Sequence, residues 1–227
     1  MSISNEELLS HVDHTLLKAQ ATYDDIKTIC DDAIKYKTAS VCIPPNYIKR
    51  VHKDYPSLNI CTVIGFPLGY SVKEAKIAEA KKAVLDGANE VDMVINISDV
   101  KNGLFDDVFN EIVDIKNVVK ENDKNKILKV IIETCYLTES EKIKMCEIVT
   151  KSGADYIKTS TGFGTAGATH EDIKLFKEHI GTGVKIKAAG GMSDLEDMRK
   201  YLSEGAERLG TSKAVSIIKS KKVDSSY

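Results

Sequence analysis

The feature that most constrains the fold of this chain is the regular alternation of short β-like runs with longer helical segments. We predict eight strands, of which the first and the last have weak patterns: His11–Thr15, Ser40–Ile43, Ile60–Gly65, Glu90–Asn96, Ile127–Glu133, Tyr156–Ser160, Val184–Ala188 and Arg208–Gly210. Short strands that alternate with helices pair in parallel, because each helix carries the chain back across the sheet.

The helical segments between these runs contain residues that begin and end helices. Ser71–Leu85 has apolar residues at helical spacing, and Gly87 lies just past its end. Thr138 and Glu141 have the spacing of a capping box, which predicts a helix over Glu141–Lys151. Further helices are predicted over Ser4–Ser10, Asp106–Lys120 and His170–His179.

Eight strand–helix units predict a closed (β/α)8 TIM barrel. The chain has no linker or low-complexity segment, so we expect residues 1–227 to form a single domain with a short N-terminal helix and a flexible C-terminal tail. An open, doubly wound parallel sheet is the alternative, and the number of strands argues against it.

The composition excludes several classes of protein. The net charge is −2 and basic and acidic residues are interleaved, so we expect a solvated surface and no nucleic-acid partner. No apolar run approaches the roughly 20 residues of a membrane span, and the N-terminus has no signal-peptide pattern. The five cysteines are scattered and form no C-x-x-C pair. This scatter argues against a disulfide framework or a zinc site and favours a cytoplasmic protein, and we read Cys42 and Cys61 as small buried side chains.

Two lysines occur near the ends of apolar predicted strands, where an ammonium group is costly to bury. Alternation along barrel strands places Asp92, Lys158 and Lys187 in one interior, with Asn96 and Lys185 facing the same way. Catalytic groups of such barrels lie at the C-terminal ends of the strands. Lys158 and Lys187 fit that location better than Asp92, which comes early in its run.

Lys158 and Lys187 are on adjacent predicted strands and are therefore expected to be neighbours. One carboxylate cannot neutralise two ammonium groups, so one amine tends toward its neutral, nucleophilic form. This pattern indicates Schiff-base chemistry, which needs no metal and no cofactor. The five histidines have no metal-ligand spacing with carboxylates either. The alternative is a structural ion pair without a catalytic role.

Glycine-rich turns follow the late strands of the predicted barrel. Gly162 comes after Lys158, the pair Gly190-Gly191 comes after Lys187, and Gly210 precedes a predicted helix. Backbone N–H groups and hydroxyls in the loops after strands 7 and 8 commonly hold a phosphate in such barrels. The same glycines also fit ordinary turns.

Segments spread in order over nearly the whole chain resemble class I deoxyribose-phosphate aldolases. They are Val12–Leu17, Val41–Pro45, Val63–Gly69, Glu90–Asn96, Lys129–Thr134, Tyr156–Gly167, Lys187–Gly191 and Arg208–Ser212, and the run Ile157–Phe163 is quite specific. The resemblance implies a cytoplasmic barrel, commonly dimeric, that reversibly cleaves 2-deoxy-D-ribose 5-phosphate to D-glyceraldehyde 3-phosphate and acetaldehyde.

The resemblance also implies roles for single residues. Lys158 would form the Schiff base, Lys187 would be the neighbouring cation that favours the neutral amine, and Asp92 would relay protons with an ordered water. The terminal Tyr227 would exchange protons at the donor carbon, unless it is a frayed end. Substrate and phosphate would be bound by Asp13, Thr15, Thr161, Gly162, Gly190, Gly191, Gly210, Thr211 and Ser212.

Two positions depart from the pattern of the family. Many relatives carry Arg-Thr shortly after the glycine pair, where this chain has Ser193-Asp194, and many have a second serine where it has Lys213. We expect Lys213 to replace part of the missing positive charge, as a point cation rather than a bidentate fork.

Two other functions stay open at this point. One is another Schiff-base lyase, such as a transaldolase-like enzyme, which would prefer a ketose donor. The other is a barrel that binds a sugar phosphate without turning it over, although such a protein has no reason to hold two like charges together.

Overall fold

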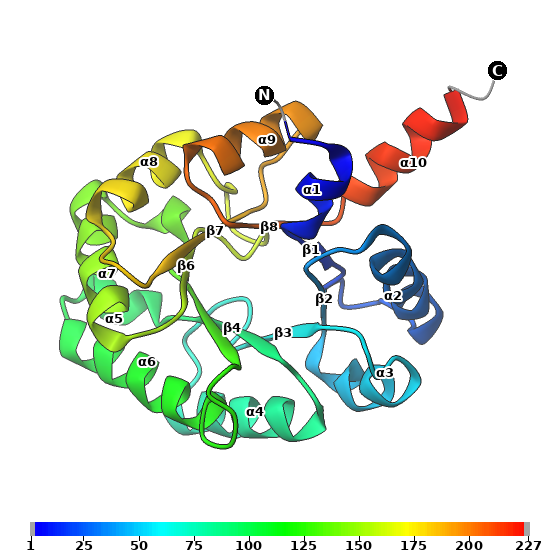
Figure 1. Cartoon of the computed structure of the whole chain (residues 1–227). Coiled ribbons are helices and arrows are strands. Elements are labelled where there is room, and N and C mark those ends of the chain that lie inside the picture. The colour runs from blue at the N-terminus through cyan, green and yellow to red at the C-terminus, as the bar shows by residue number, and fades with distance from the viewer. Residues whose placement is uncertain (1–2, 225–227) are drawn as a thin grey trace.

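The computed structural model describes residues 3–224 and forms a closed barrel of eight parallel strands inside a ring of helices (Figure 1). The strands are β1 (Val12–Thr15), β2 (Ser40–Ile43), β3 (Ile60–Ile64), β4 (Glu90–Val94), β5 (Ile127–Ile131), β6 (Tyr156–Lys158), β7 (Lys185–Ala189) and β8 (Arg208–Thr211). Each strand pairs with the next along the chain, and β8 closes the ring by pairing with β1.

The ring closure confirms the predicted (β/α)8 barrel and excludes the doubly wound sheet. A doubly wound sheet commonly binds a dinucleotide at a G-x-G-x-x-G turn, and Gly162, Gly164 and Gly167 of this chain have that spacing. They lie in the loop between β6 and α8, however, and the strand order is that of a barrel. The expectation that residues 1–227 form one domain stays a prediction, and Tyr227 lies outside the described residues.

The helices follow the strands in order. They are α1 (Asn5–Ser10), α2 (Tyr23–Tyr36), α3 (Ile48–Asp54), α4 (Lys73–Asp86), α5 (Ile97–Lys101), α6 (Phe105–Val119), α7 (Glu139–Ser152), α8 (His170–His179), α9 (Leu195–Glu204) and α10 (Ala214–Asp224), with short 3₁₀ turns at Pro45–Tyr47 and Thr134–Tyr136. None of the helices within residues 3–224 combines the length and the apolar character that crossing a bilayer requires.

Local sequence rules explain where the helices begin and end. The Thr138 side chain accepts a hydrogen bond from the Glu141 N–H and the Glu141 carboxylate accepts one from the Thr138 N–H, which is the predicted capping box at the start of α7. Gly87 ends α4 with a φ of 113°. A Cβ there would lie 2.4 Å from the His52 ring, so this position requires glycine.

The apolar core lies mainly between the strands and the surrounding helices. Val91, Met93, Leu128, Ile157 and Phe176 are all fully buried there. The barrel interior is different, because several buried side chains that point into it carry charge, among them Asp13, Asp92, Lys129 and Lys187. This charged interior sets the chemistry of the site.

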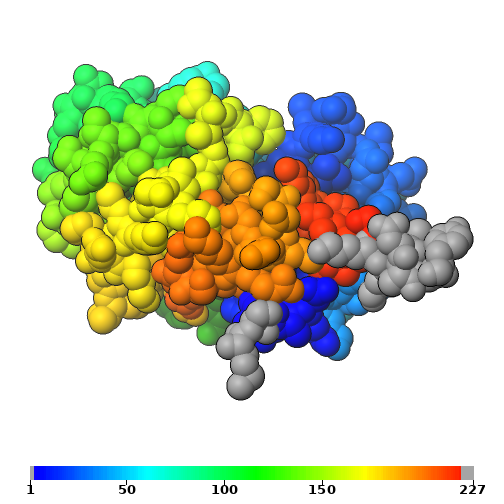
Figure 2. Space-filling view, turned by 90° about the horizontal axis from the view of Figure 1, so that it is seen from above, coloured from blue at the N-terminus to red at the C-terminus, as the bar shows by residue number. Residues whose placement is uncertain are grey.

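The two ends of the described chain meet on one side of the barrel. Helix α10 contacts α1 and β1, and in the space-filling view its red surface lies against the blue N-terminal part (Figure 2). The Lys219 ammonium of α10 pairs with Asp32 of α2 at 2.6 Å. Helix α10 is thus fastened to the barrel by packing and by charge.

Candidate active site

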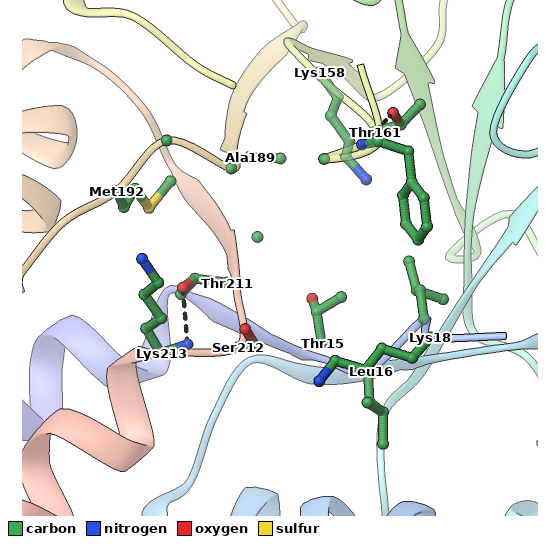
Figure 3. A pocket seen from close by; sticks show the side chains of 16 residues that line it. Thr15, Leu16, Lys18, Lys158, Thr161, Ala189, Met192, Thr211, Ser212 and Lys213 are labelled. Atoms are coloured by element: carbon green, nitrogen blue, oxygen red, sulfur yellow. Dashed lines mark hydrogen bonds between the residues drawn. The ribbon is translucent and has the colours of Figure 1, made fainter. Parts of the chain in front are cut away.

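A pocket opens at the C-terminal ends of β1, β6, β7 and β8 (Figure 3). Lys158 and Thr161 line one side of it, and Met192, Thr211 and Lys213 line the other. Among the residues predicted to bind substrate, the pocket brings together Thr15, Thr161, Gly162, Gly190, Gly191, Gly210, Thr211 and Ser212. This is the location that the barrel topology predicts for a site.

Lys158 is the last residue of β6, and Lys187 is its register partner on β7. The Nζ of Lys158 donates to Oδ2 of Asp92 at 2.8 Å, and the Nζ of Lys187 donates to the same oxygen at 2.7 Å. The predicted proximity of the two lysines is therefore confirmed. Of the two, only Lys158 lines the pocket, and Lys187 is fully buried beneath it.

The charge cluster is larger than the sequence analysis predicted. Lys129 of β5 donates to Oδ1 of Asp92 at 2.8 Å, and Arg208 of β8 contacts Asp13 at 2.5 Å and Glu90 at 3.0 Å. Lys187 also pairs with Asp13. The premise that Asp92 is the one carboxylate available to the two lysines was thus wrong. Among the described residues this cluster holds four cations, Lys129, Lys158, Lys187 and Arg208, against three carboxylates, Asp13, Glu90 and Asp92.

The cations outnumber the carboxylates in this cluster, and the expectation that one amine is neutral stays a prediction. Three carboxylates cannot neutralise four cations, so a neutral amine relieves the repulsion. Lys129 and Lys187 each contact two or more carboxylates, and Arg208 keeps its proton in proteins. Lys158 differs from these three cations, because within residues 3–224 its ion-pair partner is Asp92 alone and its side chain lines the pocket.

The directions of the pKa shifts follow from this network. Burial alone would raise the pKa of Asp92, but Lys129, Lys158 and Lys187 outweigh it and hold that pKa well below its ordinary value. Burial would lower the pKa of Lys187, but Asp13 and Asp92 raise it above the ordinary value. Asp92 thus stays ionised and Lys187 stays a cation.

Asp13 lies below the pocket rather than in it. Its carboxylate is fully buried and accepts hydrogen bonds from Ser40 Oγ at 2.7 Å and from Lys187 and Arg208. Burial alone would raise the pKa of Asp13, but Lys187, Lys129 and Arg208 hold it below the ordinary value. Asp13 is therefore not part of the pocket lining, because β1 enters the pocket only at its last residue, Thr15, and the predicted role of Asp13 toward the substrate stays a prediction.

Two inward orientations from the strand alternation were also wrong. Lys185 is the first residue of β7, so its side chain leaves the lower mouth of the barrel and pairs with Glu207 at 3.3 Å with half its surface exposed. Asn96 lies beyond the end of β4, and its side chain accepts a hydrogen bond from the Ser98 N–H at the start of α5. Alternation fails at strand ends because the backbone is no longer held by two neighbouring strands.

The comparisons with known proteins agree with this geometry. A sequence model described as a DeoC/LacD family aldolase matches residues 8–215. The chain belongs to the DeoC/LacD family of aldolases. As a member of this family it is a carbon–carbon lyase.

Relatives of this aldolase match it over nearly its whole length. A protein of Clostridium botulinum (strain Alaska E43 / Type E3) named deoxyribose-phosphate aldolase is 66% identical over 96% of this chain and 97% of its own length. One of Clostridioides difficile (strain 630) with the same name is 58% identical over 94% and 96%. The solved deoxyribose phosphate aldolase of Aeropyrum pernix, described as tetrameric, is 30% identical over 96% of this chain and 92% of its own, with a TM-score of 0.88.

The loop that follows Lys158 in this aldolase is held by a residue that the sequence analysis missed. Glu133 is buried, has a left-handed φ of 52°, and accepts hydrogen bonds from the Thr161 hydroxyl and from the Thr161 N–H at 3.2 Å. The Thr161 hydroxyl in turn accepts a hydrogen bond from the Phe163 N–H at 3.0 Å. Glu133 thereby positions one wall of the pocket.

Of the other missed residues, Lys129 alone had a usable signal in the sequence. Lys129 lies inside the apolar run Ile127–Glu133, where alternation places it inward by the argument used for Asp92. Glu90 and Arg208 begin their predicted strands, where alternation is least certain. Only the pairing of β4 with β5 and of β8 with β1 brings these charges together.

The glycines of the pocket allow a close approach of backbone to a ligand. Gly162, Gly190 and Gly191 have φ values of 86°, 69° and 75°, a region that favours glycine. A Cβ at Gly167 would lie 2.4 Å from the Gly190 backbone. Ser193, at the first position of the Arg-Thr pair of many relatives, does not line the pocket, whereas Lys213 does.

Cys42, Cys61 and Asp92 bring possible metal-ligand atoms within 4.8 Å of one another. Lys129, Lys158 and Lys187 already donate hydrogen bonds to the Asp92 carboxylate. Their positive charges oppose a metal cation at this place. The arrangement is suited to amine chemistry.

Proposed function

We propose that this aldolase reversibly cleaves 2-deoxy-D-ribose 5-phosphate to D-glyceraldehyde 3-phosphate and acetaldehyde through a Schiff base on Lys158. The observation that carries the proposal is one amine that opens into the pocket while it shares a carboxylate oxygen with a second, buried ammonium group. The names of the close relatives support the choice of substrate.

The reaction begins with the amine of Lys158. Its neutral form adds to the aldehyde carbon of the open-chain sugar, and loss of water from the carbinolamine gives an iminium ion. Lys187 stays protonated and favours the neutral form of its neighbour. Asp92 lies 2.8 Å from Nζ of Lys158, so it can relay protons between that amine and an ordered water.

The iminium ion then accepts the electrons of the breaking bond. The hydroxyl on the third carbon of the sugar gives its proton to the ordered water at Asp92, and the bond between the second and third carbons breaks. The third carbon leaves as the aldehyde of D-glyceraldehyde 3-phosphate, and an enamine of acetaldehyde stays on Lys158. Protonation of the enamine and hydrolysis of the resulting imine release acetaldehyde. Proton transfer to the donor carbon is the step that the resemblance assigns to Tyr227.

The substrate phosphate is proposed to lie at the opposite side of the pocket from Lys158. The loops after β7 and β8 supply the backbone N–H group of Gly191 and the hydroxyl of Ser212, and Gly190 and Gly210 line the same part of the pocket. The Lys213 ammonium supplies a charge on the same side (Figure 3). Distance between the phosphate and the amine selects a substrate of fixed length.

Borohydride reduction in the presence of acetaldehyde tests the covalent step. We expect mass spectrometry to find one reduced acetaldehyde unit on the wild type, on the peptide with Lys158, and none on that peptide in Lys158→Ala. Lys185→Ala is the matched control, because Lys185 lies at the exposed end of the neighbouring strand, and it should still be labelled at Lys158. Labelling of Lys158→Ala equal to that of the wild type would overturn the proposal.

The same trapping separates the alternative enzyme class. A transaldolase-like enzyme would be labelled with dihydroxyacetone rather than with acetaldehyde. Turnover of 2-deoxy-D-ribose 5-phosphate separates catalysis from sugar-phosphate binding alone.

We also propose a domain organisation, a cellular location and an oligomeric state for this aldolase. Residues 1–227 act as one aldolase domain in the cytoplasm, where free thiols such as the five cysteines of this chain persist. Two chains pair as a homodimer, and light scattering of the purified protein tests the stoichiometry. The tetrameric relative supports self-assembly and makes a tetramer the competing outcome.

A further inference from the structure

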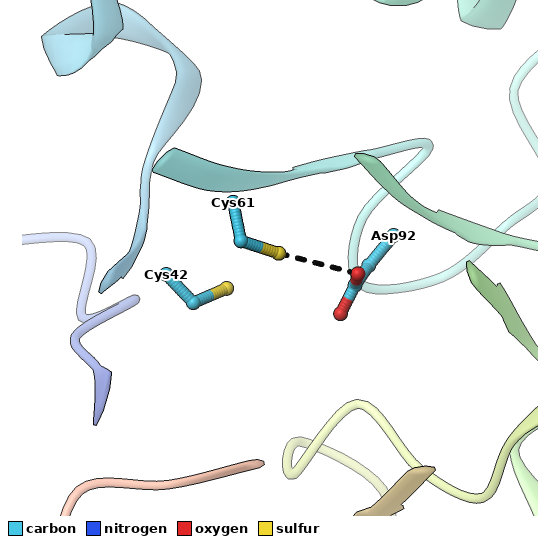
Figure 4. A group of neighbouring side chains, drawn as sticks. All are labelled: Cys42, Cys61 and Asp92. Carbon is cyan, nitrogen blue, oxygen red and sulfur yellow. Dashed lines mark hydrogen bonds between the residues drawn. The ribbon is translucent and has the colours of Figure 1, made fainter. Parts of the chain in front are cut away.

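Two buried cysteines lie directly beneath the pocket. Cys42 of β2 and Cys61 of β3 are register partners, and they are 1% and 0% exposed. Their sulfur atoms and the Asp92 carboxylate face one another inside the barrel, all within 4.8 Å (Figure 4). The reaction described above uses neither thiol.

The backbone places the two cysteines at a distance that suits a disulfide bond. Neighbouring parallel strands lie about 4.8 Å apart. Disulfides span Cα atoms about 4.4–6.8 Å apart. Because Cys42 and Cys61 are opposite each other and point to the same side, rotation of the side chains can bring the sulfur atoms together.

The surroundings make the two thiols unequal. The neighbouring Cys61 side chain lowers the pKa of the Cys42 thiol, burial and the Asp92 charge oppose this, and Lys187 and Lys158 add to the lowering. Burial raises the pKa of the Cys61 thiol well above its ordinary value. A thiolate is the reactive form toward peroxides, so Cys42 is the attacking sulfur and Cys61 is the partner that resolves the product.

A small oxidant has a short route to these thiols. Thr15 and Leu17 line the pocket and are neighbours of the thiols: Thr15 is the register partner of Cys42, and Leu17 packs against the cluster of Cys42, Cys61 and Val63. Hydrogen peroxide is little larger than water. We infer that movement of these two side chains admits it.

We propose that Cys42 and Cys61 form a peroxide-sensitive pair that closes to a disulfide and switches the site off. The Cys42 thiolate attacks one oxygen of hydrogen peroxide, the O–O bond breaks, and the released hydroxide takes a proton to form water. The Cys61 sulfur then attacks the Cys42 sulfenic acid, whose hydroxyl leaves with the Cys61 proton as a second water. Two thiols are oxidised and one peroxide is reduced, and a thiol reductant reverses the change.

The disulfide affects the site through Asp92. The Cys61 thiol is 3.2 Å from Oδ1 of Asp92 and donates a hydrogen bond to it, and a disulfide sulfur has no proton to donate. The other oxygen of the same carboxylate holds Lys158 and Lys187. Loss of the donor and movement of the Cys61 side chain therefore disturb the carboxylate that orients the amine. This consequence rests on the proposed function, whereas formation of the disulfide does not.

The test is mass spectrometry of the reduced protein after exposure to hydrogen peroxide and alkylation of the remaining thiols. We expect the wild type to lose two hydrogens, to yield a cross-linked peptide pair with Cys42 and Cys61, and to revert with dithiothreitol. Cys61→Ala should form no cross-link and should carry sulfenic or sulfinic acid on Cys42. Cys146→Ala is the matched control, since burial raises the pKa of that α7 thiol to about 12, and it should behave like the wild type.

Activity is measured on the same samples. We expect at least a tenfold loss of aldol cleavage in oxidised wild type that dithiothreitol restores, and a loss in Cys61→Ala that dithiothreitol does not restore once sulfinic acid has formed. Oxidation of other cysteines without a Cys42–Cys61 cross-link would overturn the pair, and a cross-linked protein with full activity would overturn the switch. A reduced protein with no turnover at all would instead count against the proposed function.

Discussion

Asp92 shows how one residue can organise a charged interior. Its two carboxylate oxygens accept hydrogen bonds from Lys129, Lys158 and Lys187 and from the Cys61 thiol. A carboxylate at this place offsets part of the cost of burying three ammonium groups, because it pairs with Lys158 and adds a second or third partner of opposite sign for Lys187 and Lys129. The same contacts give Asp92 both a structural and a chemical role.

Replacement of Asp92 by asparagine is expected to weaken the fold and to change its response to acid. In the wild type the pKa of Asp92 is lower in the folded than in the unfolded state. Its stabilising effect is therefore complete above the unfolded pKa of about 3.9 and is lost as the pH falls below that value. Asp92→Asn should lose roughly 3–5 kcal/mol at pH 7 and show a shallower decline between about pH 5 and 2.

Urea unfolding followed by circular dichroism measures both effects, because the chain has no tryptophan for fluorescence. Asp106→Asn, at an exposed position of α6, is the control and should keep the wild-type decline. An equally steep acid response in Asp92→Asn would contradict the assigned charge contacts.

Lys213 provides a second test at the scale of a single residue. Lys213→Ala should raise KM for 2-deoxy-D-ribose 5-phosphate about tenfold, the effect of about 1.4 kcal/mol of lost charge contact. KM for unphosphorylated 2-deoxy-D-ribose should stay the same, since it has no phosphate to lose. Lys200→Ala, an exposed lysine on α9, should change neither constant. Equal increases for both substrates would show that Lys213 does not contact the phosphate.

At the scale of elements, a buried ion pair ties two helices to the barrel. Lys76 of α4 is fully buried, donates to the Val94 carbonyl of β4 at 2.9 Å, and contacts Glu111 of α6 at 2.8 Å. Burial lowers the pKa of Lys76 and raises that of Glu111 despite their mutual attraction. Both shifts disfavour the charged forms, so the pair fits an orienting role better than a stabilising one.

Removal of one partner should therefore destabilise the fold much more than removal of both. Lys76→Met leaves the Glu111 charge buried without its partner and should cost roughly 3–5 kcal/mol of unfolding free energy. The double variant Lys76→Met with Glu111→Leu should recover most of that loss. Lys144→Ala, which breaks the exposed Lys144–Glu147 pair, should cost about 0–1 kcal/mol. Chemical denaturation measures all three, and a double variant as unstable as the single one would refute this interpretation.

At the scale of the whole molecule, the last helix closes the ring beside the first strand. His14 of β1 is nearly buried and lies 3.8 Å from Asp32 of α2, which in turn pairs with Lys219 of α10. Burial lowers the pKa of His14, the Asp32 charge opposes the shift, and the Lys219 charge adds to it. The folded state thus holds His14 neutral at a pH where the unfolded chain already takes up a proton.

This difference predicts a pH dependence near neutrality. Because the unfolded chain binds more protons, stability should fall as the pH drops below the unfolded histidine pKa of about 6.5. The urea midpoint of the wild type should decrease between pH 7.5 and about 5.5. His14→Phe should flatten this decrease, and His179→Gln, at an exposed position of α8, should not. If the urea midpoint of His14→Phe fell with pH as steeply as that of the wild type, titratable groups other than His14 would be responsible.

Much of the fold and part of the site could be predicted from local patterns. Thr138 with Glu141 and Gly87 set helix ends through contacts within a few residues, so the sequence alone determines them. Alternation along apolar strands placed Lys158, Lys187 and Asp92 inside the barrel because each side of a strand meets a different environment.

Only the tertiary structure decided how the interior charges are paired. Asp13, Glu90, Lys129 and Arg208 come from β1, β4, β5 and β8, and closure of the ring brings them into one network. The position of Asp13 below the pocket and the orientation of Cys42 toward Cys61 likewise follow from strand register. Register depends on contacts between residues far apart in the chain, and no local pattern carries that information.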